Sequence, residues 1–235
     1  MSGVVHNEKS ALLNHTRAPK RFGLALCAVI FDYGMVLTGP PDPKAHAELL
    51  RITGLPTEKL DALYWADRNA FDEGKLNGHT YWQGIAQKAG LALSPAAIEE
   101  LIQWDAHLWM ALNPPMLAWA DALKARGIRT AILSNMGDTV LDAMEREFDW
   151  LASFDVLVWS YQLHMAKPDA AIYLYALEKL GTRPEETLFI DDRQVNVEAA
   201  ASLGIKALVF TTAENLRADL IAHGFDKELP LPAKA

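Results

Sequence analysis

CAVIFDYGMVLT, residues 27–38, joins an apolar run to a single carboxylate. The run extends from Leu24 to Phe31, and its β-branched and aromatic residues predict a strand buried on both faces, as in a parallel sheet. Asp32 follows directly, and Gly34 stands two residues further on. Ligands of open α/β sheets bind beyond the carboxyl ends of the strands. Asp32 is therefore a candidate nucleophile, metal ligand or helix cap.

The composition narrows the class of protein. With 235 residues, 51% of them hydrophobic, the chain is long enough for one large domain or two small ones. A formal net charge of -8 argues against nucleic acid or an anionic membrane as a partner, because either would repel the protein. The single cysteine, Cys27, excludes an internal disulfide and fits a reducing, cytoplasmic location. No apolar run approaches the ~18 residues needed to span a bilayer.

The two ends of the chain lie outside the predicted domains. Residues 1–22 are polar and lack periodicity, and we expect them to form an N-terminal extension. Basic residues before Leu24 imitate a signal peptide, but no small-residue cleavage site follows, so the apolar run is interpreted as the first core strand. Residues 225–235 are expected to form a C-terminal tail.

Helix signals fill the chain from Gly39 to Leu112. Amphipathic helices are predicted over 43–53, 57–71, 79–89 and 95–112. We interpret residues 41–113 as a helical cap inserted into the core domain. Its aromatic residues recur at helical spacing, which favours a bundle core over a ligand site; they are Tyr64, Trp65, Phe71, Tyr81, Trp82, Trp104 and Trp109.

Strands and helices alternate after residue 113. Strands are predicted over 129–133, 155–159, 187–190 and 206–210, with helices over 116–126, 139–148, 167–180, 193–203 and 213–222. This alternation predicts an α/β fold, a doubly wound parallel sheet with helices on both faces. The core domain would comprise residues 23–40 and 114–224.

Chemically reactive side chains follow the predicted strands. In a parallel sheet the strand ends meet at one edge, where they would gather Asp32, Ser134, Lys167, Asp191 and Asp192. Two carboxylates ~4 Å apart repel by ~4 kcal/mol at an effective dielectric constant of 20, so a divalent cation is expected among them. Oxygen ligands favour Mg²⁺ over Zn²⁺. A carboxylate nucleophile, a metal, a hydroxyl and an ammonium group together indicate phosphoryl transfer.

Four motifs carry a resemblance to a known family: FDYGMVLT at 31–38, ILSN at 132–135, Lys167-Pro168, and FIDDR at 189–193 followed by Asn196. In this order and context the chain resembles the haloacid dehalogenase-like hydrolase superfamily, in the branch with a helical cap after the first motif. The resemblance covers residues from about 24 to 222.

The resemblance implies a role for each matching residue. Asp32 would be the nucleophile that forms an aspartyl-phosphate. Asp32, Asp192 and the main-chain carbonyl of Gly34 would bind Mg²⁺, with Asp191 as a ligand or directly behind the ligands. Ser134, Asn135 and Lys167 would bind the phosphoryl group, and Lys167 would also steady Asp32.

One position departs from the family pattern. Phosphatases of this family usually carry a second Asp, the general acid and base, where this chain has Gly34. Leaving-group basicity should then govern the rate unless another residue supplies the proton, and Gly34→Asp should help alkyl phosphates most. Within the cap, His79, His107 and Asp105 are the candidate donors. Some relatives with Gly at this position resemble sugar-1-phosphate phosphatases.

Three alternatives compete with a Mg²⁺-dependent phosphatase acting on a small phosphorylated metabolite. A 2-haloacid dehalogenase uses the same nucleophile but does not keep an acidic pair such as Asp191-Asp192. A phosphonate-cleaving enzyme needs a Schiff-base lysine from the cap, for which Lys59, Lys75 and Lys88 qualify by location. The third alternative is a non-catalytic module that binds a phosphorylated metabolite. The identity of the substrate and the oligomeric state are not predicted.

Overall fold

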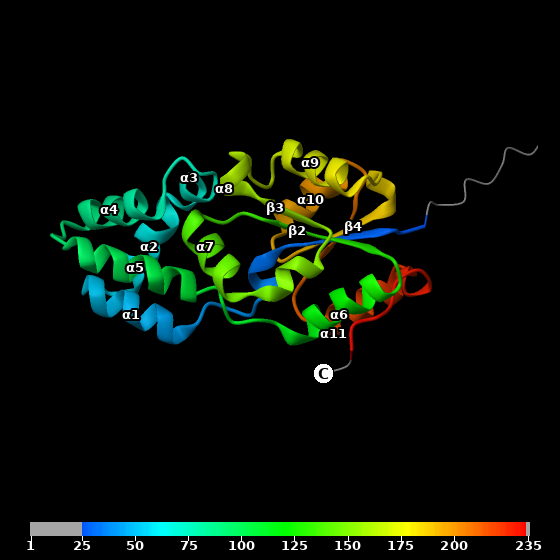
Figure 1. The fold of residues 1–235 in the computed structure, drawn as a ribbon, viewed down its shortest axis with the longest axis horizontal. Coiled ribbons are helices and arrows are strands. Elements are labelled where there is room, and N and C mark those ends of the chain that lie inside the picture. The colour runs from blue at the N-terminus through cyan, green and yellow to red at the C-terminus, as the bar shows by residue number, and fades with distance from the viewer. Residues whose placement is uncertain (1–24, 234–235) are drawn as a thin grey trace, which may run out of the picture.

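A computed structural model describes residues 25–233, and its centre is a five-stranded parallel sheet (Figure 1). The strand order is β3-β2-β1-β4-β5. The strands are β1 (Ala28–Phe31), β2 (Arg129–Ser134), β3 (Val156–Trp159), β4 (Thr187–Asp191) and β5 (Lys206–Val209). The central strand, β1, pairs in register with both neighbours, so Ala28 lies beside Arg129 and Thr187. The predicted N-terminal extension, residues 1–22, lies outside the described residues.

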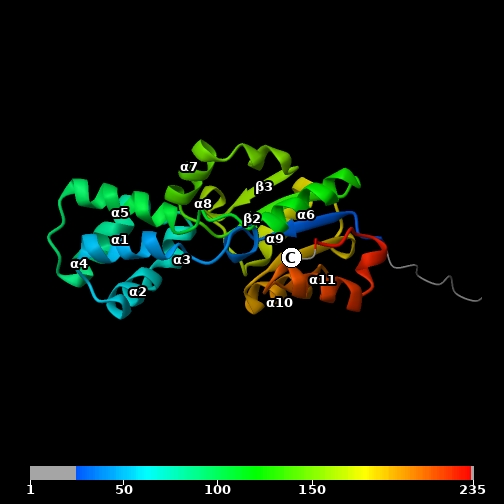
Figure 2. The same cartoon turned by 90° about the horizontal axis from the view of Figure 1, so that it is seen from below.

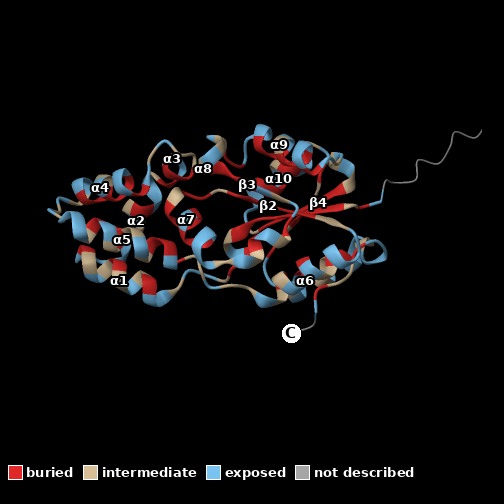
Figure 3. Cartoon of the chain, in the orientation of Figure 1, coloured by how far each residue is buried: buried red, intermediate tan, exposed pale blue. Residues whose placement is uncertain are grey.

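Helices cover both faces of the sheet, and its inner strands β1, β2 and β4 are almost entirely buried (Figure 3). Apolar side chains of α6 (Pro114–Ala125), α7 (Asp138–Glu147) and α11 (Ala213–Ala222) form one core cluster with the sheet. Those of α9 (Ala170–Leu180) and α10 (Gln194–Ser202) form the cluster on the other face. The predicted doubly wound parallel α/β fold is confirmed. Among the described helices, none is both long and apolar enough to cross a membrane.

A group of helices, here called the cap helices, lies beyond the carboxyl ends of the strands rather than on a sheet face (Figures 1 and 2). They are α1 (Pro43–Thr53), α2 (Thr57–Ala66), α3 (Arg68–Asp72), α4 (Gly78–Ala89) and α5 (Pro95–His107). They enclose an apolar cluster of their own, which includes Leu49, Leu60, Trp82 and Leu101. The division of the chain into a core domain and a cap domain stays a prediction.

Two of the predicted cap helices differ from expectation, one by a break and one by an earlier end. The helix predicted over 57–71 is interrupted at Asp67, and its last turn, α3, carries the buried side chains of Arg68 and Asp72. The helix predicted over 95–112 ends at His107, because the following residues pair with the segment that leaves β1. Thr38 and Leu112 form an antiparallel bridge there, and the Gly39 N–H donates to the Ala111 carbonyl at 2.7 Å.

A short helix, α8 (Ser160–Leu163), directly follows β3 and has no counterpart among the predicted elements. The helix predicted to start at Lys167 begins at Ala170 instead, so Lys167 lies in the loop between α8 and α9. This loop brings the lysine to the edge of the sheet where β1 and β4 end.

Candidate active site

Asp32 stands at the carboxyl end of β1, the middle strand. Its N–H continues the sheet by donating to the Ile190 carbonyl at 2.8 Å. Its side chain is buried, and the Oδ1 atom accepts a hydrogen bond from the Tyr33 N–H at 2.7 Å. The turn that follows, Tyr33–Leu37, bends away from the sheet, and Met35 adopts a left-handed backbone conformation with φ of 62°. These contacts fix Asp32 at the carboxyl end of the middle strand.

Lys167 is a buried cation that contacts two carboxylates. Its Nζ atom lies 2.9 Å from Asp32 Oδ1 and 2.7 Å from Asp191 Oδ2. The Asn135 side chain holds the backbone of Lys167 from both sides: its Nδ2 donates to the Lys167 carbonyl, and its Oδ1 accepts from the Lys167 N–H, both at 2.8 Å. Asn135 was predicted to bind substrate. Its amide is engaged with the backbone of Lys167, and Asn135 also lines the cavity, so its role in binding substrate stays a prediction.

The two adjacent carboxylates after β4 occupy different environments. Asp191 is fully buried, and besides Lys167 it accepts hydrogen bonds from the Arg193 N–H at 2.8 Å and from Asn196 Nδ2 at 3.0 Å. Asp192 is partly exposed and lines the cavity described below, whereas Asp191 lies behind it. Asp191 therefore contacts Lys167, and of the two carboxylates Asp192 is the one that lines the cavity.

Burial and charge have opposite effects on these groups. Burial raises the pKa of Asp32 to about 7, against the lowering influence of Lys167. For Lys167, burial lowers the pKa, but the neighbouring Asp32 and Asp191 outweigh it, so the pKa is raised and the ammonium form persists. Burial, and then Asp191, raise the pKa of Asp192. The site thus holds more carboxylate groups than its one buried cation can neutralise.

The three carboxylates lie close enough together to bind one metal ion. Asp32, Asp191 and Asp192 each offer an oxygen atom, and these atoms all lie within 4.8 Å of one another. An all-oxygen set of this kind suits a hard cation such as Mg²⁺. Asp32 and Asp192 face the cavity, as does Gly34, whose carbonyl is the other predicted ligand.

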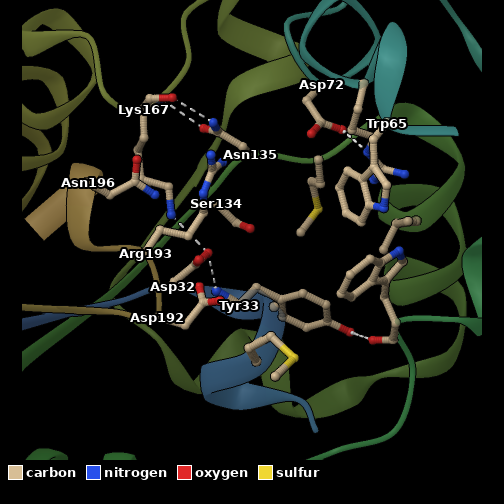
Figure 4. Close-up of a pocket in the computed structure, with 16 residues that line it drawn as sticks. Asp32, Tyr33, Trp65, Asp72, Ser134, Asn135, Lys167, Asp192, Arg193 and Asn196 are labelled. Atoms are coloured by element: carbon tan, nitrogen blue, oxygen red, sulfur yellow. Dashed lines mark hydrogen bonds and ion pairs between the residues drawn. The ribbon is translucent and has the colours of Figure 1, made fainter. Parts of the chain in front are cut away.

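A cavity of about 150 Å³ opens in front of these groups (Figure 4). It separates the ends of the sheet from the cap side. Its core wall includes Asp32, Tyr33, Gly34, Ser134, Asn135, Lys167, Asp192, Arg193 and Asn196. Its cap wall is formed by Trp65, Arg68, Asp72 and Trp109. The site residues predicted from the strand ends are thus brought together, and Ser134 is buried beside them.

The other residues singled out in the cap lie elsewhere. His79 is exposed and pairs with Glu99, His107 is exposed, and Asp105 is fully buried among the cap helices, where it accepts a hydrogen bond from Tyr64 at 2.7 Å. The lysines considered for a Schiff base are exposed, and none lines the cavity: Lys59, Lys75 and Lys88.

The residues of the cap wall were not predicted as site residues from the sequence. Trp65 was interpreted as bundle core, yet it is 57% exposed and lines the cavity. The helical periodicity could have indicated that Trp65 is exposed. Leu60 and Tyr64 mark the buried stripe of α2, and Trp65 falls one position off that stripe. Arg68 and Asp72 carried no signal in their spacing.

The fold and the site define an α/β enzyme of the hydrolase class. The model of the haloacid dehalogenase-like hydrolase family matches residues 28–204, and the chain belongs to this family. The predicted superfamily and the prediction of an enzyme are therefore confirmed.

Curated relatives include phosphatases. Phosphatase MT3486 of Mycobacterium tuberculosis (strain CDC 1551 / Oshkosh) is 27% identical over 190 residues, which are 78% of this chain and 87% of that protein. Bifunctional epoxide hydrolase 2 of Mus musculus is 34% identical over 128 residues, 52% of this chain. The match spans only 23% of the mouse protein.

Solved structures share the fold. A HAD family enzyme of Bacteroides thetaiotaomicron, BT-2542, superposes with a TM-score of 0.68 at 21% identity, covering 80% of this chain and 94% of that one. The wild-type form of that enzyme is also known in complex with magnesium and inorganic phosphate, with a TM-score of 0.65 at 23% identity.

Proposed function

We propose that the protein is a Mg²⁺-dependent phosphatase of a small phosphorylated metabolite, and that it works through a phosphorylated Asp32. The observation that carries the proposal is the charge of the site. Three carboxylates with oxygens within 4.8 Å of one another share one buried ammonium group. Such a set is stable around a divalent cation, and it then presents positive charge to a phosphoryl group. The phosphatases among the relatives, and the magnesium and phosphate bound to BT-2542, support this reading.

Asp32 is assigned the nucleophilic role. Its Oδ1 atom is held by the Tyr33 N–H and by Lys167, which leaves Oδ2 outside both contacts. Oδ2 attacks phosphorus, the bond between phosphorus and the leaving oxygen breaks, and Asp32 becomes an aspartyl-phosphate. Water then attacks phosphorus, the bond to Asp32 breaks, and inorganic phosphate departs. Lys167 and Ser134 hold the phosphoryl oxygens in both steps.

Asp32, Asp192 and the Gly34 carbonyl are the proposed Mg²⁺ ligands, and Asp191 stands behind them. When bound, Mg²⁺ would neutralise these carboxylates and the charge on the phosphoryl oxygens. Asp191 keeps Lys167 in place through the 2.7 Å contact.

We assign the cap helices the role of a cover over the cavity. Trp65 and Trp109 present aromatic surface to the substrate side, and their ring centroids lie 6.4 Å apart. A cover of this kind excludes water from the reacting phosphoryl group and strengthens its interactions with charged residues. The contacts that distinguish one substrate from another would come from this wall.

The phosphatase reading is preferred over the two hydrolase alternatives on structural grounds. A dehalogenase has no use for an additional cavity-facing carboxylate such as Asp192. A phosphonate-cleaving enzyme requires a cap lysine at the cavity, and Lys167, which comes from the core, is the one lysine that lines it among the described residues.

A screen of phosphorylated metabolites and acyl phosphates, with and without Mg²⁺, tests the proposal. We expect turnover with Mg²⁺, none after chelation, and none for Asp32→Asn, which keeps the size of the side chain but removes the nucleophilic carboxylate. Thermal unfolding provides the control that the variant is folded. Chelator-resistant turnover, or full activity of Asp32→Asn, would contradict the mechanism.

A further inference from the structure

Asp72 is a cap carboxylate with no role in the mechanism so far. Three carboxylates line the cavity: Asp32 and Asp192 from the core, and Asp72 from α3. The first two are accounted for as nucleophile and metal ligand. Asp72 is 8% exposed, so most of its surface is removed from bulk water. A buried carboxylate at a reaction cavity is costly unless it is paired or protonated.

A rigid network holds Asp72 in place. Its Oδ1 atom accepts a hydrogen bond from Arg68 Nε at 2.8 Å, and its backbone carbonyl accepts one from Ser160 Oγ of the core at 2.6 Å. Arg68 is itself fixed, because its guanidinium lies over the rings of Tyr64 and Phe71, at 5.1 and 5.2 Å from their centroids. The other carboxyl oxygen of Asp72, Oδ2, takes no part in these contacts.

The position of Asp72 suits the leaving group. In an in-line displacement the leaving oxygen departs on the side of phosphorus opposite the nucleophile. Asp32 forms part of the core wall, so the leaving oxygen points toward the cap wall. Asp72 and Trp65 lie on that side of the cavity, across from Asp32, Asp192 and Lys167 (Figure 4).

Burial and neighbouring charges act in opposite directions on the pKa of the Asp72 carboxyl group. Burial raises the pKa of its carboxyl group above the ordinary value, while the Arg68 guanidinium opposes this rise. Asp105 raises the pKa further and Arg193, from the core, lowers it. Tyr81 also lies near enough for Asp72 to contribute to raising the pKa of its hydroxyl group. The net direction of the shift in the pKa of Asp72 is upward.

We propose that Asp72 is the general acid and base that stands in for the carboxylate missing at Gly34; this rests on the proposed phosphatase function. As Asp32 Oδ2 bonds to phosphorus and the bond to the leaving oxygen breaks, Asp72 gives its proton to that oxygen, and the alcohol departs. Asp72, now ionised, takes a proton from the water that attacks the aspartyl-phosphate. Phosphate leaves Asp32, and Asp72 is protonated again. Protons and bonds balance over the cycle.

Single-turnover kinetics of Asp72→Asn test this role, because they report the first step alone. The probes are p-nitrophenyl phosphate, whose leaving group needs no proton, and an alkyl phosphate that the wild type turns over. We expect the variant to slow the alkyl phosphate by about 100-fold or more and p-nitrophenyl phosphate by less than about threefold. Asp67→Asn is the matched control, since Asp67 lies just before α3, pairs with Lys88, and does not line the cavity.

Each outcome of these kinetics either supports or overturns the role of Asp72 as general acid. If Asp72→Asn slows both probes equally, Asp72 acts in binding or folding, and the proposal is overturned. Unchanged rates for both probes would also overturn it. Should Asp72→Asn fail to fold, the wild type decides: a working acid makes its rate depend weakly on leaving-group basicity, and a steep dependence overturns the role. A wild type that cleaves p-nitrophenyl phosphate and every phosphate ester of the screen no faster with Mg²⁺ than without it contradicts the proposed function itself, and the role of Asp72 with it.

Discussion

At the scale of single residues, Lys167 determines what the site can do. Its ammonium group joins the proposed nucleophile, Asp32, to the buried Asp191, so the three side chains form one unit. Removing one member of such a buried charged group leaves the others uncompensated, which typically costs about 3–5 kcal/mol. Asn135 and Asn196 belong to the same unit, because they hold the backbone of Lys167 and the carboxylate of Asp191.

Gly34 has room for a carboxylate. Its φ of -61° is open to any residue, and an added Cβ would lie 3.8 Å from the Trp109 ring, an ordinary contact. The sequence alone predicts that Gly34→Asp accelerates alkyl phosphates. With Asp72 in place, we expect Gly34→Asp to raise the rate of alkyl phosphate cleavage by less than about tenfold. In the Asp72→Asn background we expect the same substitution to restore most of the ~10²–10⁴ in rate that general acid catalysis supplies.

This expectation is tested by the rates of alkyl phosphate cleavage in Gly34→Asp, in Asp72→Asn and in the double variant. Mg²⁺ affinity serves as the control, since a new carboxylate adds negative charge to an acidic site. If Gly34→Asp accelerates the wild type by the full factor and rescues nothing in Asp72→Asn, then Asp72 is not the proton donor.

At the scale of elements, the strands and their ends could be predicted, whereas the cap wall could not. A parallel sheet places the carboxyl ends of all its strands at one edge, so topology alone brings Asp32, Ser134 and Asp192 together. The helix over Pro43–Thr53 was predicted with its observed bounds, because Pro43 and Gly54 mark its ends. The break at Asp67 has no glycine or proline to signal it. Arg68 and Asp72 reach the cavity through the packing of the cap helices on the core, which local periodicity does not encode.

The cap helices and the core meet closely at Gly78, the first residue of α4. Its N–H donates to Asp138 Oδ1 of α7 at 3.0 Å, and a Cβ added to Gly78 would overlap the methyl group of Thr139. We expect Gly78→Ala to push α4 away from α7 and to destabilise the protein by about 1–3 kcal/mol. Since α3 lies just upstream, the shift should also misplace Asp72 and lower kcat/KM by about tenfold or more.

Gly84 provides the matched control within the same helix. A Cβ there meets nothing within 4 Å, so Gly84→Ala should stabilise the helix by up to about 1 kcal/mol and leave kcat/KM unchanged. Urea unfolding and steady-state kinetics of both variants check the pair. Equal stability and activity of the two alanine variants would show that the contact at Gly78 does not position the cap helices.

At the scale of the whole molecule, two structural parts contribute opposite walls to one cavity. The parallel sheet supplies the nucleophile, the lysine and the carboxylates, and the cap helices supply aromatic surface and Asp72. Four short motifs indicate the family from the sequence alone, because their order along the chain matches the order of the strands that they follow. Substrate identity could not be predicted in this way, since it depends on the cap wall.

The central claim is that Asp32 becomes phosphorylated, and mass spectrometry of an acid-quenched reaction tests it most directly. Wild-type protein is mixed with substrate and Mg²⁺, quenched during turnover and digested. The account predicts that the peptide containing Asp32 gains the mass of one phosphoryl group, and that neither chelated wild type nor Asp32→Asn does. Phosphoryl modification of another residue, or turnover of substrate with Asp32 unmodified throughout, would contradict it.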